Sequence, residues 1–450
     1  MPKRRRPPLS RDFLADDVPQ VHRTLLEHVL ANNAKLSKVK IAKLPHGIGI
    51  VASENIGKNE DITFIPKSLL VNLHDIPIPN SSPIDYPTRV HSSLAAYIAS
   101  KRHNGENDPF ISILPSPESF KTSMPMSWSD EVLSHCSPWV RSFALKQKEK
   151  LQDDYDHAVK VHTPKNLNFT QEEYDWAWAV VNTRTIYYRP KKWYKIPAED
   201  CMTMCPFIDY YNHDWRSDDT CIVSFSTDGL TVTTQKAYVP GEEIFVTYGE
   251  YNNDHLLVEY GFTLPNNGSD NIKLDFWVLG KLSGRHQEIL KEKSFHGYAL
   301  TFKSDKVYSG SDLMVSVDGD GNSEYVLDAE DACYRTMMAL RLAVIPSAQL
   351  PRGNGKGGKR YLDFVKLVEG EMEEDDYGEK YSDDEGAVRG LLGDIVNEAE
   401  ELGRDSMENL RGMLDGPNDE ENEGSISSAI ERWTQMLDVI NKYKQKTIET

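Results

Sequence analysis

The residues from Cys205 to Trp215, CPFIDYYNHDW, combine groups that can do chemistry with large aromatic rings. Asp209 brings a carboxylate, Asn212 an amide and His213 an imidazole. Rings of this size tend to be buried, and buried polar groups need hydrogen-bond partners. We therefore interpret the segment as the wall of a site, formed by one strand whose alternate side chains face different neighbours.

Two further segments could add backbone groups and phenols to such a site. The first, KLPHGIGIVA (43–52), contains a Gly-rich turn, and glycine allows close approach to the backbone. The second, GEEIFVTYGEYNNDHLLVEYGF (241–262), contains Tyr248 and Tyr260. A phenol hydroxyl can donate and accept hydrogen bonds, and its ring can exclude water. Taken alone, the turn is typical of a hairpin, and each tyrosine is typical of core packing.

Three other motifs fail the requirements of the chemistry that they resemble. GNGKGGKR (353–360) nearly spells a phosphate-binding loop, but Arg360 stands where a magnesium-binding Ser or Thr is needed. DGDGNSE (318–324) begins like a calcium loop but lacks the required Gly. The possible zinc ligands lack the paired spacing of a structural site, so we expect no metal and buried thiols. These ligands are Cys201, Cys205, His213 and Cys221.

Short strands and a helical region must position the three segments. Alternating apolar residues predict strands over 37–71 and 222–247, the latter with a hairpin turn at Asp228-Gly229. Residues 85–188 have helical spacing, and their last helix begins with a capping box at Thr170 and closes before Pro190.

The chain beyond about residue 266 is expected to be mostly helical. Helices are predicted near 328–345 and 425–446. Residues 369–385 hold ten acids and one lysine. Such a block repels itself, so we expect a disordered acidic insertion over about 352–386. The order of strands, helical insert, strands and helical tail indicates an α+β protein.

Composition limits the partners and the compartment. The chain has 450 residues, with 51 Lys+Arg against 70 Asp+Glu and a net charge of −19. This charge disfavours nucleic acid and anionic membranes and favours a basic partner. Five cysteines, an odd and sparse set, indicate a reducing compartment. No apolar run reaches the ~18 residues needed to span a bilayer, and we expect no secretory signal. The basic cluster Lys3–Arg6 is either a nuclear import element or part of a solvated tail.

The three segments in this order, with VVNTRTIYY at the end of the helical insert, resemble the SET-domain protein methyltransferases. The closer resemblance is to the branch that includes the Rubisco large-subunit and ribosomal-protein lysine methyltransferases and the actin-histidine methyltransferase. It covers about 37–265 and, more loosely, the helical tail. Most histone-directed members carry a cysteine-rich zinc segment after the final YG, and its absence here fits the non-histone branch. The implied fold has short antiparallel sheets with a knot-like crossing.

The resemblance divides the chain into five segments. They are an N-terminal basic tail and leading helix (1–36), the first part of the SET domain (37–84), a helical insert (85–188), the second part of the SET domain with the cofactor and catalytic motifs (189–265), and a helical substrate-binding-like domain (266–450).

The resemblance also implies S-adenosylmethionine as the cofactor and assigns residues to it. The turn would contact its methionine and ribose part, Asn212 and His213 would bind its amino-acid and adenine parts, and Arg184 would pair with its carboxylate. Tyr248 would orient the methyl group and stabilise developing charge. The turn residues are His46, Gly47, Ile48 and Gly49.

On the substrate side, Tyr260 would line a channel for the target side chain, with Thr183 at its rim. A narrow aromatic channel lowers the pKa of a lysine, which is otherwise near ~10.4, so that the neutral amine can attack. Asp209 either recruits the ammonium form of the lysine or caps the backbone.

We therefore expect a protein-lysine methyltransferase with a basic non-histone substrate, a ribosomal protein or translation factor being favoured. It would be a monomer in the cytoplasm or the nucleus. The alternatives are a protein-histidine methyltransferase and a catalytically silent SET-like scaffold. The retained Tyr248, Asn212 and His213 speak against the scaffold.

Overall fold

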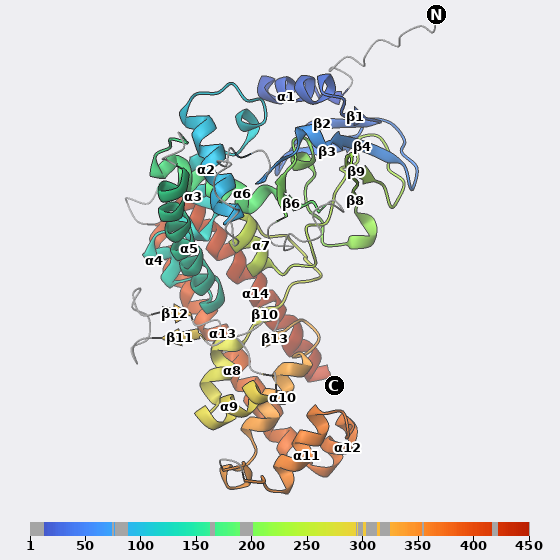
Figure 1. Ribbon diagram of the computed structural model, residues 1–450. Helices are drawn as coiled ribbons and strands as arrows, with labels where there is room; N and C mark the ends of the chain where they lie inside the picture. Colours follow the sequence, from blue (N-terminus) through green and yellow to red (C-terminus); the bar gives the residue numbers. More distant parts are fainter. Residues whose placement is uncertain are drawn as a thin grey trace, which may run out of the picture. The chain divides into compact units, whose positions relative to one another are not determined.

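The computed structural model of the chain describes residues 13–73, 76, 89–162, 167–189, 201–293, 295, 300–302, 313–315, 325–352, 355–415 and 422–449. The chain divides into two compact units (Figure 1). The first unit comprises Met1–Lys121, Gln147–Tyr251 and Glu259–Gly261, and the second comprises Thr122–Lys146, Asn252–Val258 and Phe262–Thr450. The first unit holds short antiparallel sheets and the second is largely helical, which confirms the predicted α+β class.

Three antiparallel sheets lie among the described residues of the first unit. Their strand orders are β1-β4-β9-β8, β2-β3 and β5-β7-β6. The strands are β1 (Lys35–Leu36), β2 (Val39–Leu44), β3 (Gly47–Ala52), β4 (Asp61–Pro66), β5 (Val71–Asn72), β6 (Thr185–Tyr187), β7 (Met202–Met204), β8 (Ile222–Phe225) and β9 (Gly229–Thr233).

Glycines permit two tight turns of these sheets. β2 and β3 form a hairpin that closes with Leu44 opposite Gly47, and Gly47 has φ +134°. In the β8–β9 hairpin, Gly229 has φ +155°, and a β-carbon there would lie 2.1 Å from the carbonyl oxygen of Ile65. Glycine adopts these positive φ angles readily, and at position 229 it also avoids the clash that a β-carbon would make with Ile65. The strands predicted for 37–71 and the turn at Asp228-Gly229 are confirmed.

Helices complete the first unit. α2 and α6 pack against each other, and the capping box predicted at Thr170 is present. α6 ends at Arg184, earlier than expected, because Thr185 already pairs with Met204 in a sheet; Pro190 lies outside the described residues. The helices that lie mostly in this unit are α1 (Gln20–Ala31), α2 (Val90–His103), α3 (Pro117–Ser123), α5 (Pro138–His162) and α6 (Gln171–Arg184).

The segment 205–214 is not the strand that the sequence predicts. Ile208–Tyr210 form a 3-10 turn, η9, which follows Phe207 with φ +74° and ψ −42°. This conformation is rare for a bulky residue, yet Phe207 is fully buried. Parallel bridges join Val246 to His213 and to Cys221, so the segment lies beside the one that leads to Tyr248. Tertiary contacts therefore override the local preference for a strand.

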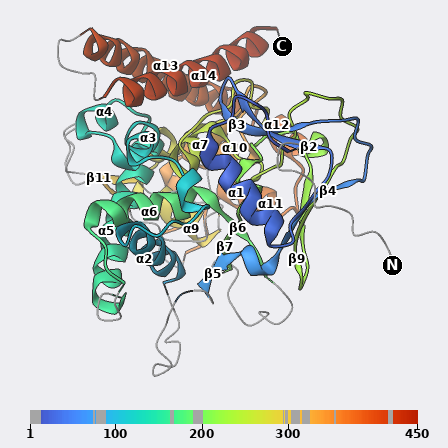
Figure 2. The ribbon, with the colours of Figure 1, turned by 90° about the horizontal axis from the view of Figure 1, so that it is seen from above.

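The second unit is built around long helices. α13 and α14 pack side by side, and Figure 2 shows them as the two longest ribbons. Their apolar faces bury Leu392, Ile395, Trp433 and Ile440. The remaining elements are α4 (Asp130–Ser134), α7 (Asn253–Tyr260), α8 (Asp275–Lys281), α9 (Gly284–Glu292), α10 (Tyr334–Ala343), α11 (Lys359–Val368), α12 (Glu374–Lys380), α13 (Ser382–Leu414), α14 (Glu423–Glu449), and the strand pairs β10 (Ile272–Lys273) with β13 (Val326–Leu327) and β11 (Leu300–Phe302) with β12 (Leu313–Val315).

Most of the acidic segment 369–385 is helical, in α12 (Glu374–Lys380) and at the start of α13 (Ser382–Leu414), so the disorder predicted over about 352–386 is wrong for the described residues. Tyr377 of α12 is 1% exposed and anchors the segment in the core. Arg341 of α10 donates hydrogen bonds to Glu374 at 2.8 Å and to Glu385 at 2.7 Å. Self-repulsion of the acids is thus offset by a cation that is distant in sequence and by aromatic burial.

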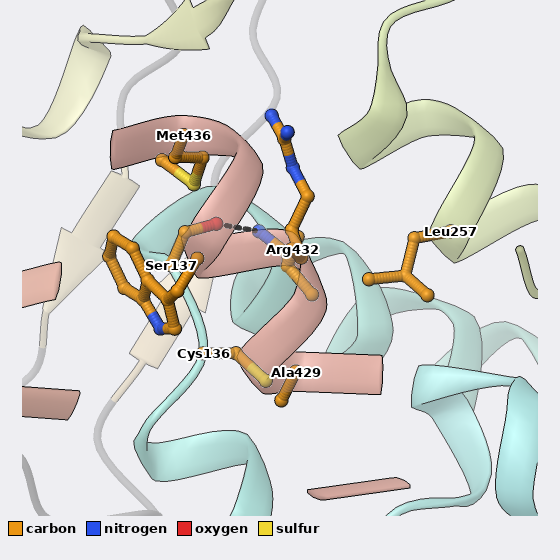
Figure 3. A pocket seen from close by; sticks show the side chains of 8 residues that line it. Cys136, Ser137, Leu257, Ala429, Arg432 and Met436 are labelled. Carbon is orange, nitrogen blue, oxygen red and sulfur yellow. Dashed lines mark hydrogen bonds between the residues drawn. The ribbon is translucent and has the colours of Figure 1, made fainter. Parts of the chain in front are cut away.

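One cavity in the core of the second unit is too small for a cofactor. Its volume is about 10 Å³, the space of a single water molecule (Figure 3). It is lined by Cys136, Ser137, Val140, Leu257, Ala429, Arg432, Trp433 and Met436. Among the described helices, none combines the length and apolar composition needed to cross a membrane.

Candidate functional site

The structure brings the three predicted segments together in the first unit. The amide nitrogen of Asn212 donates to the carbonyl oxygen of Ile48 at 3.3 Å and to Oε1 of Glu243 at 2.8 Å. Nε2 of His46 lies 3.1 Å from the same Glu243 oxygen and 3.4 Å from the Asn212 nitrogen. The Gly-rich turn, the 205–214 segment and the strand region after Gly241 therefore meet at one polar cluster.

Gly49 makes this convergence possible. A β-carbon at Gly49 would stand 2.8 Å from the Asn212 amide nitrogen, 2.9 Å from Glu243 Oε1 and 2.6 Å from Leu44 Cδ1. These separations are shorter than van der Waals contact, so any side chain would push Asn212 away. Gly47 has a different role, because nothing lies near its β-position and its positive φ alone explains it.

Tyr248 is fixed from two sides. Its hydroxyl donates to the carbonyl oxygen of Tyr211 at 3.0 Å, and its backbone N–H donates to Nδ1 of His213 at 3.1 Å. The Tyr248 ring stacks on the His213 ring with centroids 5.0 Å apart. Desolvation raises the pKa of Tyr248 to about 12, and the nearby Asp209 carboxylate adds to this increase. The phenol is therefore protonated at neutral pH.

Further aromatic rings surround Tyr248. The ring of Tyr260 lies 5.2 Å from the Tyr248 ring, and the ring of Tyr251 lies 6.3 Å from that of Tyr260. Asn182 of α6 holds the end of α7 because its amide donates to the carbonyl oxygen of Glu259 at 2.9 Å and to Glu259 Oε2 at 3.0 Å. Burial raises the pKa of Tyr260 above its usual range. The three rings form an aromatic wall beside Tyr248, and the role of Tyr260 in lining a substrate channel stays a prediction.

Arg184 and Asp209 form an ion pair next to this wall. Arg184 Nη1 lies 2.7 Å from Asp209 Oδ2, and the Asp209 side chain is 8% exposed. Burial raises the pKa of Asp209, although the Arg184 charge opposes this shift. Within the described part of the chain, Asp209 therefore pairs with an arginine side chain, and its role towards a substrate lysine or the backbone stays a prediction.

The Nε of Arg184 is the notable atom of this pair. It is buried, and within the described part of the chain it has no hydrogen-bond partner. A buried donor without an acceptor costs about 1–3 kcal/mol, so a ligand that supplied an acceptor here would recover this free energy.

Thr183 points its hydroxyl into its own helix. The oxygen donates to the carbonyl oxygen of Ala179 at 2.9 Å, a bond within α6. The side chain is half-buried at the end of the helix, next to Arg184. Its predicted place at the rim of a channel stays a prediction.

Sequence reasoning missed Glu243, Asn182 and Tyr211. Glu243 links Asn212 to His46, Asn182 holds the helix end before Tyr260, and Tyr211 contributes only its carbonyl oxygen to Tyr248. Glu243 and Asn182 stand inside the segments GEEIF and VVNTRT, so their position was a usable signal. The Tyr211 carbonyl is a backbone group that every residue has, so no residue type in the sequence could indicate its role.

The cysteines near the site are buried thiols. Cys205 and Cys221 are each 2% exposed, and burial raises the pKa of Cys221 to about 11. Among the described residues, no group of three or more His, Cys, Asp or Glu side chains is placed to hold a metal ion.

Comparisons with known proteins match the part of the chain that holds this geometry. The SET domain family matches residues 47–249. The chain is 25% identical over 376 residues to the ribosomal lysine N-methyltransferase set11 of Schizosaccharomyces pombe, covering 82% of this chain and 84% of that protein. It is 27% identical to SET domain-containing protein 4 of Artemia parthenogenetica, covering 54% of this chain and 62% of that one. The chain thus spans less than two thirds of the latter relative.

A solved structure agrees at the level of the fold. The structure of Rubisco LSMT bound to AdoMet superposes with a TM-score of 0.56 and 15% identity, over 96% of this chain and 93% of that one. At this identity the likeness concerns the fold alone. The predicted SET fold followed by a helical region is confirmed.

Proposed function

We propose that the chain is a SET-domain protein methyltransferase and that it transfers a methyl group from S-adenosylmethionine to a lysine side chain of a ribosomal or other translation-associated protein. The observation that carries the proposal is the meeting of the turn at His46–Gly49, Asn212–His213 and Tyr248 in one place. The net charge of −19 favours a basic protein as the substrate.

The residues present fit S-adenosylmethionine. Its carboxylate suits the buried Nε of Arg184, which lacks an acceptor in the described part of the chain. Its methionine part suits the turn where Gly49 leaves no room for a side chain, beside the amide of Asn212. When bound, the group supplies an electrophilic methyl on a sulfonium.

Tyr248 would direct the methyl group towards the acceptor. Its hydroxyl proton is directed to the Tyr211 carbonyl at 3.0 Å, so the lone pairs of the phenol oxygen face the other way. They can accept weak hydrogen bonds from a polarised methyl group and stabilise its positive charge. Because the pKa of Tyr248 is raised to about 12, this orientation persists at neutral pH.

The aromatic wall and the ion pair would favour the neutral lysine. The rings of Tyr248, Tyr260 and Tyr251 exclude water, which lowers the pKa of an amine between them. A free carboxylate would have the opposite effect by holding the ammonium form. The charge of Asp209 is compensated by Arg184 at 2.7 Å, so Asp209 opposes deprotonation less than a lone acid would.

The test is labelling with S-adenosylmethionine carrying a radioactive methyl group. The purified protein is incubated with this donor and with ribosomal and soluble fractions of a cell extract, and the labelled residue is identified by mass spectrometry. We expect one or few labelled proteins, each methylated on lysine. Tyr248→Phe should weaken the labelling. Tyr155→Phe is its matched control, since Tyr155 packs against Phe169 and Tyr174, away from the site, and should leave labelling unchanged. Methylated histidine would reassign the acceptor, and the absence of any labelled protein would contradict the proposal.

A further inference from the structure

Helix α1 lies outside the residues that match the SET domain, yet it packs into the same unit. Leu25, Leu26 and Val29 of α1 are fully buried and form one stripe along the helix. His22 lies on the same stripe, at i−3 and i−7 from Leu25 and Val29, and is 8% exposed. An apolar side chain would suit this position better by burial alone, so the imidazole needs another explanation.

His22 is joined to the site through Tyr210. Its Nδ1 lies 2.8 Å from the Tyr210 hydroxyl, and the two rings pack edge to face with centroids 5.5 Å apart. Burial lowers the pKa of His22. Nδ1 of a neutral imidazole can accept a hydrogen bond from the Tyr210 hydroxyl. This bond is directional, whereas apolar packing is not.

Tyr210 belongs to η9, a turn that its own sequence does not stabilise. The turn has no side-chain cap and is entered through Phe207 with a positive φ, a conformation that persists only when surrounding contacts enforce it. Three side chains of the segment provide such contacts: Tyr210 to His22, Asp209 to Arg184 at 2.7 Å, and the Tyr211 hydroxyl to Thr63 at 2.7 Å.

We propose that His22 is a positioning residue for cofactor binding, acting through Tyr210 on the turn that carries Asp209 and thereby on Arg184. The proposal depends on the function proposed above, because it takes Arg184 as the partner of the cofactor carboxylate. Helix α1 is then a functional part of the catalytic centre, although it precedes the matched domain. A shift of Tyr210 moves its neighbour Asp209, which holds the guanidinium, and Tyr211, whose carbonyl holds Tyr248.

The test uses the double variant His22→Leu with Tyr210→Phe. Replacing both members of a buried polar pair by apolar groups leaves no unpaired donor or acceptor, so the melting temperature should not fall. The directional bond is lost, and we expect calorimetry to show roughly 3- to 10-fold weaker binding of S-adenosylmethionine, the size of one hydrogen bond. KM for the cofactor should rise by the same factor while kcat changes less.

Two variants separate positioning from stability. His22→Gln keeps a hydrogen-bonding group at this position and should retain most of the affinity. Val29→Ala removes buried volume from the same helix and should lower the melting temperature without changing affinity. Equal affinities of the wild type and the double variant would overturn the inference; if the double variant does not fold, Tyr210→Phe alone decides by the same criterion. Failure of the wild type to bind the donor would instead overturn the proposed function.

Discussion

Two arginines, one in each unit, form ion pairs of different completeness: the Arg432 side chain is 3% exposed and the Arg184 side chain is 27% exposed. Arg432 of α14 donates from all three of its nitrogens, to Asp254 at 2.6 Å, to Asp270 at 2.8 Å and to the carbonyl of Asn271 at 3.2 Å. Arg184 has one ion pair, to Asp209, and its buried Nε has no partner among the described residues.

The difference indicates what each arginine is for. A guanidinium whose three nitrogens all have protein acceptors fixes the positions of the groups around it and has fewer N–H groups to offer a ligand. A guanidinium with a buried N–H that has no acceptor lowers the stability of the fold. The same N–H can bind a ligand that supplies an acceptor. We therefore interpret Arg432 as structural and Arg184 as part of the binding site, and the two should respond to substitution in opposite ways.

The largest effect is expected from Arg432→Met. Removing this cation leaves two buried carboxylates without their partner, which costs about 3–5 kcal/mol of unfolding free energy. Urea titration monitored by circular dichroism measures the loss. Arg404→Met is the matched control, because Arg404 is 66% exposed and its pair with Glu400 should contribute only ~0–1 kcal/mol. A small loss of unfolding free energy for Arg432→Met would show that the ion pairs of Arg432 with Asp254 and Asp270 are dispensable.

Arg184→Met should weaken S-adenosylmethionine binding by about 30- to 100-fold, the loss of a charge-assisted hydrogen bond. Calorimetry gives the affinity. The double variant Arg184→Met with Asp209→Leu removes the unpaired acid as well and should recover stability without recovering affinity. Recovered affinity in the double variant would mean that Arg184 only neutralises Asp209.

Tyr248→Phe should behave like a site variant and not like Arg432→Met. Its ring contacts with His213 and Tyr260 remain, so stability should change by less than ~1 kcal/mol. The loss of the hydroxyl should lower kcat by about 10- to 100-fold. Single-turnover measurements with a peptide substrate check this, and unchanged turnover would remove Tyr248 from the chemistry.

The smallest effect is expected from Asn182→Ala. It removes the bonds that fix the end of α7 and with it the Tyr260 ring, so we expect a loss of about 1 kcal/mol in stability and a few-fold rise in KM for the protein substrate. Asn409→Ala, an exposed helical asparagine, is the control for amide loss. An unchanged KM would show that Tyr260 needs no support from α6.

The sequence predicts a local structure correctly where the residue type alone requires a particular backbone conformation. Gly47, Gly49 and Gly229 predicted tight turns, and the structure gives each a positive φ or a forbidden β-position. The sequence groups the turn at Ile48, the pair Asn212–His213 and Tyr248 from three separated motifs, and the structure brings the three motifs into contact.

It failed where distant partners decide. The segment 205–214 reads as a strand, but Thr63, Arg184 and His22 hold it in a 3-10 turn. Residues 369–385 read as disordered because a local count of charges cannot include Arg341 or the burial of Tyr377. Both errors come from interactions between residues far apart in the chain, which a local pattern does not contain.

One calorimetric experiment tests the contrast between the two arginines and the function at once. S-adenosylmethionine is titrated into the wild type, Arg184→Met and Arg432→Met under conditions where circular dichroism shows all three folded. We predict one binding site in the wild type, the same affinity in Arg432→Met, and at least tenfold weaker binding in Arg184→Met. No binding to the wild type, or equal losses in both variants, would contradict the account.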